Sequence, residues 1–387
     1  METMASNSTG PEDSSDRELL IDATPLQNEH RRRGIGRYVA SIVEALVAAR
    51  VSGWGLLAYP DRRMDTTSFR VAARTPRRLE FHGGWVANEI LIPLVLRRAG
   101  VRSFHATDPR AVPDPRLVRE VVTVYDLTPS RDPAVWQAMW PDQRLGYRRM
   151  LSNVRRAPVV IAISSSVKTD LIESLRLDPA RIHVVYPPVD ATRWSLGDAH
   201  ARRSGVLFVG APDPHKNIGL VLQALALIGG GIRPALTVVG PWDPTSIRRV
   251  AAMAESLGVA APQFEPMIAD ERLGELYRSS AALVMPSRRE GFGLPVLEAM
   301  AAGCPVIASD IPSIAEVAGN AGLLLPLDAG RWAEAISSVA WDEATRVRLA
   351  EAGRRRALEF TPARTVEQLR AAYRRLGVDL RMGPGAS

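Results

Sequence analysis

The sequence lacks the features that mark several large classes of protein. Only one cysteine, Cys304, occurs in 387 residues, so the chain can form no internal disulfide and no cysteine cluster for a metal. The six histidines do not fall at ligand spacings and no Asp-x-Asp occurs, so we expect no metal and no other cofactor. The small and apolar neighbours of Cys304 are typical of a buried side chain rather than a nucleophile.

Markers of membrane-spanning and secreted proteins are also missing. No apolar run reaches the roughly 18 residues that a spanning helix needs. The opening segment, METMASNSTGPEDSSD, has no basic flank followed by an apolar core, so it indicates a disordered tail rather than a secretion signal. Together with the single cysteine, these absences favour a cytoplasmic protein.

The charge of the chain excludes few classes of binding partner. Its formal net charge is +7, but the basic residues are scattered as pairs, such as Arg62-Arg63 and Arg97-Arg98, with acidic residues between them. A nucleic-acid binding protein more often shows a concentrated basic patch with exposed aromatic residues. We therefore expect no nucleic-acid partner, while a small anionic ligand remains permitted.

Short apolar runs alternate with amphipathic segments along most of the chain, which is typical of alternating strands and helices. We predict strands at Leu19–Asp22, Val121–Tyr125, Val159–Ile163, Val184–Tyr186, Val206–Val209, Ala235–Val239, Ala281–Met285 and Pro305–Ser309. We predict helices at Ser165–Leu175, Ile218–Ile228, Asp270–Ser280, Leu294–Ala302 and Thr361–Leu376. Because these strands are apolar throughout rather than alternating, both of their faces should be buried, as in a parallel sheet.

A proline-led polar stretch interrupts this rhythm once, from YPPVD at residues 186–190 to about Gly205. The predicted fold class is therefore α/β, with two Rossmann-like, doubly wound parallel-sheet domains that face each other across a cleft. The predicted parts are a tail at 1–16, an N-terminal domain at 17–190, a linker at 191–204, a C-terminal domain at 205–360, and a C-terminal helix and tail at 361–387 that could cross back to the N-terminal domain.

The segment REGFGLPVLEAM, residues 289–300, follows a predicted strand and opens a predicted helix. Loops in this position bind ligands in open parallel sheets, and a helix start near Pro295 favours an anion. The predicted first-turn position of Glu298 would bring it to the same pocket as Glu290. Two carboxylates there would repel a bare phosphate, so as ligands they would accept hydrogen bonds from sugar hydroxyls. The residues alone do not decide between a ligand role and a helix-dipole role, because acids are common in a first helical turn for the favourable interaction with the helix dipole alone.

Two other loops could contact an anion. In VGAPDPHKN, residues 209–217, Lys216 could neutralise phosphates or simply lie on the surface, and His215 could be a second contact or solvated. In RRRGIGRY, residues 31–38, Gly34 and Gly36 would expose backbone N–H groups at a helix start. Neither this loop nor GFG at 291–293 completes G-x-G-x-x-G, so a nicotinamide cofactor is disfavoured.

Taken together, these segments resemble retaining glycosyltransferases of family 4, which have the GT-B architecture. The most specific part is DERLGELYRSSAALVMPSRREGFGLPVLEAMAAGCPVIASDIPSIAEVAGNAGLLLP at 270–326, whose centre looks like the E-x7-E element of that family. Weaker resemblance extends through VGAPDPHKN, VIAISSSVKTDL, VVTVYDLTP and RRRGIGRY, so it covers most of the chain apart from the first residues.

The resemblance implies a nucleotide-diphosphate sugar donor, GDP- or UDP-linked, and transfer of a hexosyl group, mannosyl or glucosyl, with retention and without a metal. By position, Glu298 would bind the ribose hydroxyls, Glu290 the donor sugar near its reacting carbon, and Lys216 the diphosphate. Backbone groups of the glycine turn would meet sugar and phosphate, and two glycines of the first loop would approach the phosphates from the opposite wall. These turn and loop residues are Gly291, Phe292, Gly293 and Leu294, and Gly34 and Gly36.

The chain departs from its apparent relatives at two positions. Many of them have a histidine before the aspartate in the loop that matches VYDLTP, where this chain has Tyr125 followed by Asp126. Both residues are catalytic candidates, and a tyrosine can donate a hydrogen bond to a sugar hydroxyl, but it titrates far from neutrality and cannot replace an imidazole in proton transfer. No arginine at Ala211 or Pro212 accompanies Lys216, which leaves His215 or a distant arginine to supply further charge.

Two other functions remain compatible with these residues. A phosphorylase or epimerase on the same architecture would use a nucleotide sugar without an external acceptor, and a non-catalytic protein would only bind one. The acceptor is not identified and could be lipid-linked. Trp85–Arg102 and Trp136–Arg156 combine aromatic residues with paired arginines and could touch the inner face of a membrane, or be ordinary amphipathic core helices.

Overall fold

The structure is a computed structural model that describes residues 18–28, 34–59, 71–74, 85–108, 112–114, 116–195, 203–266 and 268–383. Its first part contains β1 (Leu19–Asp22), α1 (Gly34–Ala48), β2 (Trp54–Ala58), β3 (Val71–Arg74), α2 (Trp85–Arg98), β4 (Ser103–Ala106), β5 (Arg119–Val124), α3 (Thr128–Arg131), α4 (Pro133–Ala138), α5 (Pro141–Arg156), β6 (Val159–Ala162), α6 (Ser165–Leu175) and β7 (Ile182–Val184). The short helix α7 (Ala191–Ser195) follows.

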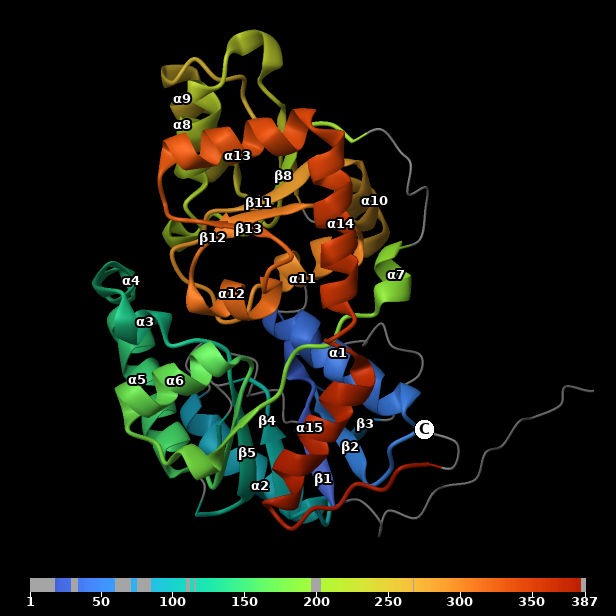
Figure 1. Cartoon of the computed structure of the whole chain (residues 1–387). Helices are drawn as coiled ribbons and strands as arrows, with labels where there is room; N and C mark the ends of the chain where they lie inside the picture. The colour runs from blue at the N-terminus through green and yellow to red at the C-terminus, as the bar shows by residue number, and fades with distance from the viewer. Residues whose placement is uncertain are drawn as a thin grey trace, which may run out of the picture.

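The second part contains β8 (Val206–Val209), α8 (Ile218–Leu227), β9 (Leu236–Val239), α9 (Pro244–Ser256), β10 (Gln263–Glu265), α10 (Asp270–Ser279), β11 (Ala282–Met285), α11 (Leu294–Ala301), β12 (Val306–Ser309), α12 (Pro312–Ala318), β13 (Leu323–Leu325), α13 (Ala329–Trp341) and α14 (Glu343–Ala357). The last helix is α15 (Pro362–Arg374). Figure 1 shows the two parts one above the other, with helices on the faces of each sheet.

Each part is built on one parallel sheet. The N-terminal sheet has the strand order β3-β2-β1-β4-β5-β6-β7 and the C-terminal sheet the order β10-β9-β8-β11-β12-β13. In both sheets the chain first winds outward in one direction and then in the other, so the order reverses between β1 and β4 and between β8 and β11. The prediction of two doubly wound α/β domains is confirmed, and ligands are expected at these two reversals, beyond the carboxyl ends of the strands.

The apolar runs explain why these strands form and where prediction failed. β1, β6, β11 and β12 are buried along their whole length, as the mostly apolar strands of a parallel sheet should be, and β4 is equally buried although Ser103 and His105 are polar. β7 lies at Ile182–Val184 instead of the predicted Val184–Tyr186, because an edge strand tolerates the polar His183 that the apolar rule rejects. The predicted segment Trp136–Arg156 is also wrong as one unit, since it includes the end of α4 and the whole of α5, which starts at Pro141.

The C-terminal helix α15 packs on the N-terminal domain, beside α1, although it follows the C-terminal domain in the sequence (Figure 1). Its Tyr373 hydroxyl lies 2.8 Å from Nδ1 of His105, whose Nε2 lies 2.7 Å from the hydroxyl of Thr123. Burial lowers the pKa of His105 to about 3, so the ring is neutral and serves this buried network. The chain therefore passes between the domains twice, and the two crossings are joined where Val189 N–H donates to Phe360 C=O at 2.9 Å.

Two smaller expectations can be compared with the described part of the chain. Cys304 is 1% exposed, and burial raises the pKa of its thiol to about 12, which confirms a packing role rather than a nucleophile. Among the described residues, no helix has the length and apolar character needed to cross a membrane. The predicted tail at 1–16 lies outside the described residues.

Candidate active site

An ion pair occupies the reversal point of the C-terminal sheet. Lys216 follows β8 and Glu290 follows β11, the two strands between which the strand order reverses. The ammonium of Lys216 donates to both carboxylate oxygens of Glu290, at 2.7 and 2.9 Å, and the two side chains are only 17% and 10% exposed. These two largely buried side chains lie side by side at this edge, where the cation can neutralise a phosphate and the acid can accept a hydrogen bond from a hydroxyl.

The glycine turn after Glu290 positions the start of α11. Gly293 has a φ of +104°, a left-handed conformation that favours glycine, and it precedes Leu294, the first helical residue. No side chain caps this helix start, but Pro295 has no N–H and the N–H of Val296 donates to the carbonyl of Gly293 at 2.9 Å, so the N–H of Leu294 is the donor that a ligand could meet at this end of the helix. Phe292 is 2% exposed and packs with Tyr186 and Phe360, with ring centroids 6.1 and 5.7 Å apart. Its side chain therefore anchors the turn, and only its backbone could meet a donor.

Glu298 lies one turn deeper in α11 than predicted. The helix begins at Leu294 and its first turn contains no acid, so placing Glu298 in the first turn was wrong, and a helix-dipole role for it loses its basis. Its side chain is instead 7% exposed and pairs at 2.7 Å with Arg37, which belongs to α1 of the other domain. The hydroxyl of Tyr277 donates to the second carboxylate oxygen at 3.1 Å.

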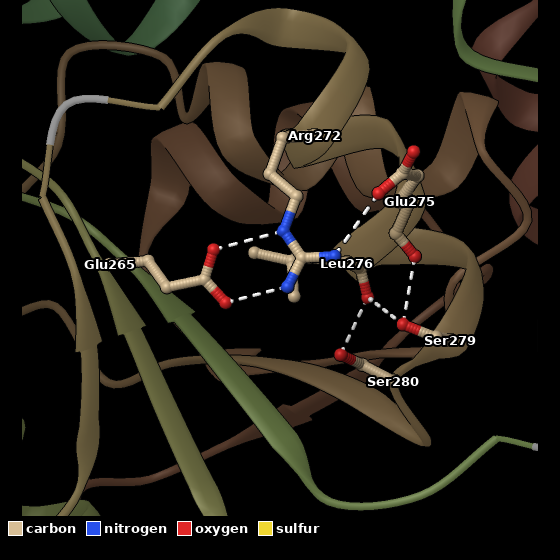
Figure 2. A network of polar contacts seen from close by, with 6 residues as sticks. All are labelled: Glu265, Arg272, Glu275, Leu276, Ser279 and Ser280. Atoms are coloured by element: carbon tan, nitrogen blue, oxygen red, sulfur yellow. Dashed lines mark hydrogen bonds and ion pairs between the residues drawn. The ribbon is translucent and has the colours of Figure 1, made fainter.

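Helix α10, which carries Asp270 and Tyr277, is tied to the neighbouring strand β10 by a polar network (Figure 2). Figure 2 shows the guanidinium of Arg272 against both carboxylate oxygens of Glu265, at 3.0 and 2.8 Å, with Glu275 on its other side at 3.1 Å. At the end of the helix, hydroxyls of two serines donate to backbone carbonyls of the last turn, as the same view shows. Surface pairs contribute little stability each, but a bidentate pair fixes orientation.

The two catalytic candidates after β5 are not free side chains. The hydroxyl of Tyr125 donates to the carbonyl of Thr107 at 2.9 Å, the residue is 9% exposed, and burial raises the pKa of the phenol well above its usual value. Asp126 is exposed and accepts a hydrogen bond from the backbone N–H of Thr128 at 2.8 Å, which starts α3. In this structure both side chains hold the loop in place.

The remaining candidates lie where the sequence suggested. Gly34 is the first residue of α1 and Gly36 lies in its first turn, while their neighbours at 31–33 are outside the described residues. His215 joins the Glu290 loop through its backbone, because its carbonyl accepts from the N–H of Arg288 at 2.8 Å. A cavity of about 200 Å³ opens beside Lys216 and is also lined by Trp242, Arg249 and Met253.

The domains meet directly at this edge, so the site is built from both. The hydroxyl of Ser164 donates to the carbonyl of Gly291 at 2.6 Å. The carboxylate of Glu316, in α12, accepts from the backbone N–H groups of Ser165 and Ser166 at the start of α6, at 2.8 and 3.2 Å, and from Tyr186 at 2.7 Å. These contacts set the carboxyl ends of the two sheets face to face.

Sequence reasoning missed the cross-domain residues of this site. Arg37 lies inside the quoted RRRGIGRY segment, but only its glycines were considered as ligand contacts. Asp270 was read as the start of a helix, and Trp194 fell in the predicted linker, yet both contact Arg37. The only signal was a charged residue in the first turn of a helix, which is too common to indicate a partner in another domain. In the described part of the chain, no three His, Cys, Asp or Glu side chains lie close enough together to hold a metal ion.

Comparison with known proteins identifies the family. The family model described as Glycosyltransferase Family 4 matches residues 32–193, and that of Glycosyl transferases group 1 matches residues 199–356. The chain belongs to glycosyltransferase family 4. The match to these two models places the Lys216–Glu290 pair within the group 1 region of this family 4 chain.

The relatives of this family 4 chain have names that refer to different glycosyl transfer reactions. It is 32% identical over 247 residues to a D-inositol 3-phosphate glycosyltransferase of Rhodococcus erythropolis, covering 59% of this chain and 56% of the relative. It is 26% identical over 310 residues to the O-antigen chain mannosyltransferase RfbU of Salmonella typhimurium, covering 77% and 82%. The chain thus spans little more than half the length of the inositol-phosphate relative.

Solved structures share the fold of this family 4 chain. HepE of Anabaena, solved in complex with UDP and glucose, superposes with a TM-score of 0.72 at 17% identity, over 92% of this chain and 99% of that one. At this identity the likeness shows the fold alone, which is the GT-B arrangement of two facing α/β domains.

Proposed function

We propose that the protein is a retaining glycosyltransferase that moves a hexosyl group, mannosyl or glucosyl, from a GDP- or UDP-linked sugar to a hydroxyl acceptor. The observation that carries this proposal is the pairing of Lys216 with Glu290 at the reversal point of the C-terminal sheet. A nucleotide sugar needs a cation for its diphosphate and an acid for its sugar hydroxyls, and these two side chains supply both side by side. The likeness to HepE, solved with UDP and glucose, and to a mannosyltransferase supports the donor class.

In this proposal the donor extends along α11. The diphosphate would lie between Lys216 and the uncapped start of α11 at Leu294, with N–H groups of Gly34 and Gly36 approaching from the first domain. The ribose would reach Glu298 one helical turn further on, and the sugar would lie against Glu290. Each acid then faces hydroxyl groups, and each phosphate faces a cation or N–H groups.

The proposed reaction needs no protein nucleophile and no metal. The sugar–phosphate bond breaks with the electron pair going to the diphosphate, where Lys216 and the helix N–H groups stabilise the growing negative charge. The acceptor oxygen forms the new bond on the same face of the sugar and passes its proton to the departing phosphate. Glu290 holds the donor sugar and stabilises positive charge at the reacting carbon. In the free protein Lys216 neutralises Glu290, so the donor enters a site whose charges are already balanced.

A panel of nucleotide sugars tests the donor class. Thermal shift with UDP- and GDP-linked glucose and mannose should raise the unfolding temperature for one base and one sugar. Release of the nucleoside diphosphate, with water as the acceptor, then measures turnover without knowledge of the natural acceptor. Rapid loss of the sugar from the donor alone would instead favour a phosphorylase or epimerase.

Glu290→Gln tests the proposed chemistry. Turnover should fall roughly 100-fold or more, while binding of the nucleoside diphosphate is kept, because the amide preserves the shape but not the charge. Glu255→Gln, on the outer helix α9, is a matched control that should behave as the wild type. Near-normal turnover of Glu290→Gln would reject its role at the reacting carbon.

A further inference from the structure

The guanidinium of Arg37 joins three elements around the proposed ribose site. It lies 2.7 Å from one carboxylate oxygen of Glu298 and 3.0 Å from Asp270, and it stacks over the ring of Trp194 at 5.6 Å. Arg37 itself belongs to the first turn of α1, whereas Glu298 and Asp270 belong to α11 and α10, and Trp194 to the connecting helix α7. A single side chain thus links the N-terminal domain, the connection and the C-terminal domain.

Glu298 depends on this cation for its charge. Its side chain is 7% exposed, and burial raises the pKa of the carboxyl, with Asp270 acting in the same direction. The charge of Arg37 and the hydrogen bond from Tyr277 oppose that rise. A buried carboxylate without a cation is costly and tends to take up a proton instead. The ion pair with Arg37 at 2.7 Å therefore favours the ionised form of Glu298, which only accepts hydrogen bonds.

The contacts of Glu298 leave two of its hydrogen-bond acceptor sites unused in the described structure. An ionised carboxylate offers about four lone-pair sites on its two oxygens. Arg37 takes one site on the first oxygen and the Tyr277 hydroxyl takes one on the second. Among the described residues nothing else contacts these oxygens, so one site remains on each, which matches the two neighbouring hydroxyls of a ribose. If Glu298 carried a proton, it would lose one of these acceptor sites.

We propose that Arg37 is a positioning residue for the ribose of the donor: it reaches across the domain boundary and holds Glu298 ionised and oriented to accept both ribose hydroxyls. This inference rests on the proposed function, since it presumes a nucleotide donor. It adds that the nucleotide site of the C-terminal domain is complete only while the N-terminal domain is in contact with it. Recognition of the ribose is thereby coupled to closure of the two domains.

The structure offers variants that separate this role from a merely structural one. Arg37→Met removes the charge and keeps the length of the side chain, and Arg37→Lys keeps the charge without the fork that bridges two carboxylates. Arg193 provides the matched control. It pairs with the other oxygen of Asp270 at 2.6 Å, is 46% exposed, and makes no contact with Glu298 in the described structure.

Calorimetric titration with UDP and GDP, and with the 2′,3′-dideoxy form of whichever binds more tightly, tests the inference. The wild type should prefer the ribose form. Arg37→Met should weaken binding of the ribose form roughly tenfold or more and leave binding of the dideoxy form nearly unchanged. Arg37→Lys should recover part of the loss, and Arg193→Met should match the wild type.

Each other outcome has a defined meaning. Equal losses for the ribose and dideoxy forms would show a structural role and overturn the inference, as would unchanged binding. Tighter binding by Arg37→Met would show that the guanidinium blocks the diol, which also overturns it. If the wild type bound neither UDP nor GDP, the proposed function would fail first, and this inference with it. Arg37→Lys carries the same comparison if Arg37→Met does not fold.

Discussion

Gly291 and Tyr125 touch across the domain boundary so closely that a β-carbon on Gly291 would overlap the carbonyl oxygen of Tyr125. Glycine is therefore required here by the approach of the other domain's backbone rather than by its own φ angle. The loop that carries Glu290 and the loop after β5 are held in van der Waals contact at this point. The contact sets the distance between the donor side and the opposite side of the site.

Replacing this glycine should separate the two sides of the site. We expect Gly291→Ala to lower turnover roughly 100-fold, because a displacement of about 1 Å between reacting groups can cost that much. The rate of donor turnover and the unfolding temperature should be measured together. Gly230→Ala is the control, since a β-carbon at Gly230 would have no neighbour within 4 Å. Full activity of Gly291→Ala would mean that the site works with the domains further apart.

Lys216 should act on the phosphates and not on the nucleoside. We expect Lys216→Met to weaken binding of the nucleoside diphosphate by about 1.5–3 kcal/mol, the usual contribution of a hydrogen bond to a charged group. Binding of the free nucleoside should change little, and titration of both ligands checks this. Lys168→Met is a close control, because Lys168 donates to the carbonyl of Ile182 on the outer side of the other sheet. A similar loss for the nucleoside would place Lys216 elsewhere in the site.

Glu120 should make the folded protein less stable as the pH rises. This buried acid lies near the start of β5, and its oxygens have no hydrogen-bond partner within the part of the chain that the structure describes. Burial raises its pKa to about 9, with Asp114 adding to the rise and Arg156 opposing it. Above about pH 4.5 the unfolded form releases the proton of Glu120, whereas the folded form keeps it. The contribution of Glu120 to the free energy of unfolding is therefore full below that pH and is lost as the pH rises towards 9.

Replacing Glu120 should remove this dependence. In Glu120→Met, the free energy of unfolding measured with urea should no longer change with pH between about pH 5 and pH 9. At pH 8 this variant should be more stable than the wild type by roughly one to a few kcal/mol. Unfolding midpoints across this range measure the effect. A wild-type curve that rises with pH in this window would contradict the protonated state of Glu120.

Helix α5 should be the part that meets an anionic membrane, if the acceptor is lipid-linked. Trp140 is 72% exposed and Leu145 56% exposed, and the guanidinium groups of Arg144 and Arg148 lie 5.7 and 5.2 Å from the ring of Trp136. Apolar side chains beside arginines suit a surface of anionic lipid. In α2, Ile92 and Leu96 are buried and Leu94 is 46% exposed, so the described part of that helix presents one exposed apolar side chain.

Sedimentation with liposomes tests this surface. Binding should increase with the content of anionic lipid, and Trp140→Ser and Leu145→Ser together should reduce it several-fold, since each removes buried apolar area. Leu227→Ser, a 64% exposed residue on α8, is the matched control. Equal binding to neutral and anionic vesicles would remove the membrane from the proposal.

Local patterns predicted much of the fold because the central parallel strands, such as β1, β6, β11 and β12, are buried on both faces. The segments Val206–Val209 and Ser165–Leu175 were predicted with the bounds that β8 and α6 have. The start of β5 was missed by two residues because Arg119 and Glu120 interrupt the apolar run, although Glu120 is buried. Apolar runs indicate where a strand lies, but a buried charge hides its end.

The candidate site was predicted in its C-terminal half and missed across the domain boundary. Lys216 and Glu290 could be proposed from the sequence because each follows a strand and precedes a helix within a short segment. The partner of Glu298 could not, since Arg37 reaches it only through the packing of two domains, and no spacing along the chain records that contact. The hydrogen bond from the hydroxyl of Tyr125 to the carbonyl of Thr107 lies within one domain, but it too depends on the pairing of β4 with β5, and no local pattern predicts it.

The position of α15 has a consequence for the order of synthesis. The strands of the first sheet, residues 19–184, leave the ribosome before any of the C-terminal domain, but the helix that covers α1 and bonds to His105 lies at Pro362–Arg374. During translation the face of the first domain that α15 covers therefore stays uncovered until residues up to Arg374 have emerged. The first domain is completed only after the strands of the second sheet have been made, so the two domains mature together rather than in sequence.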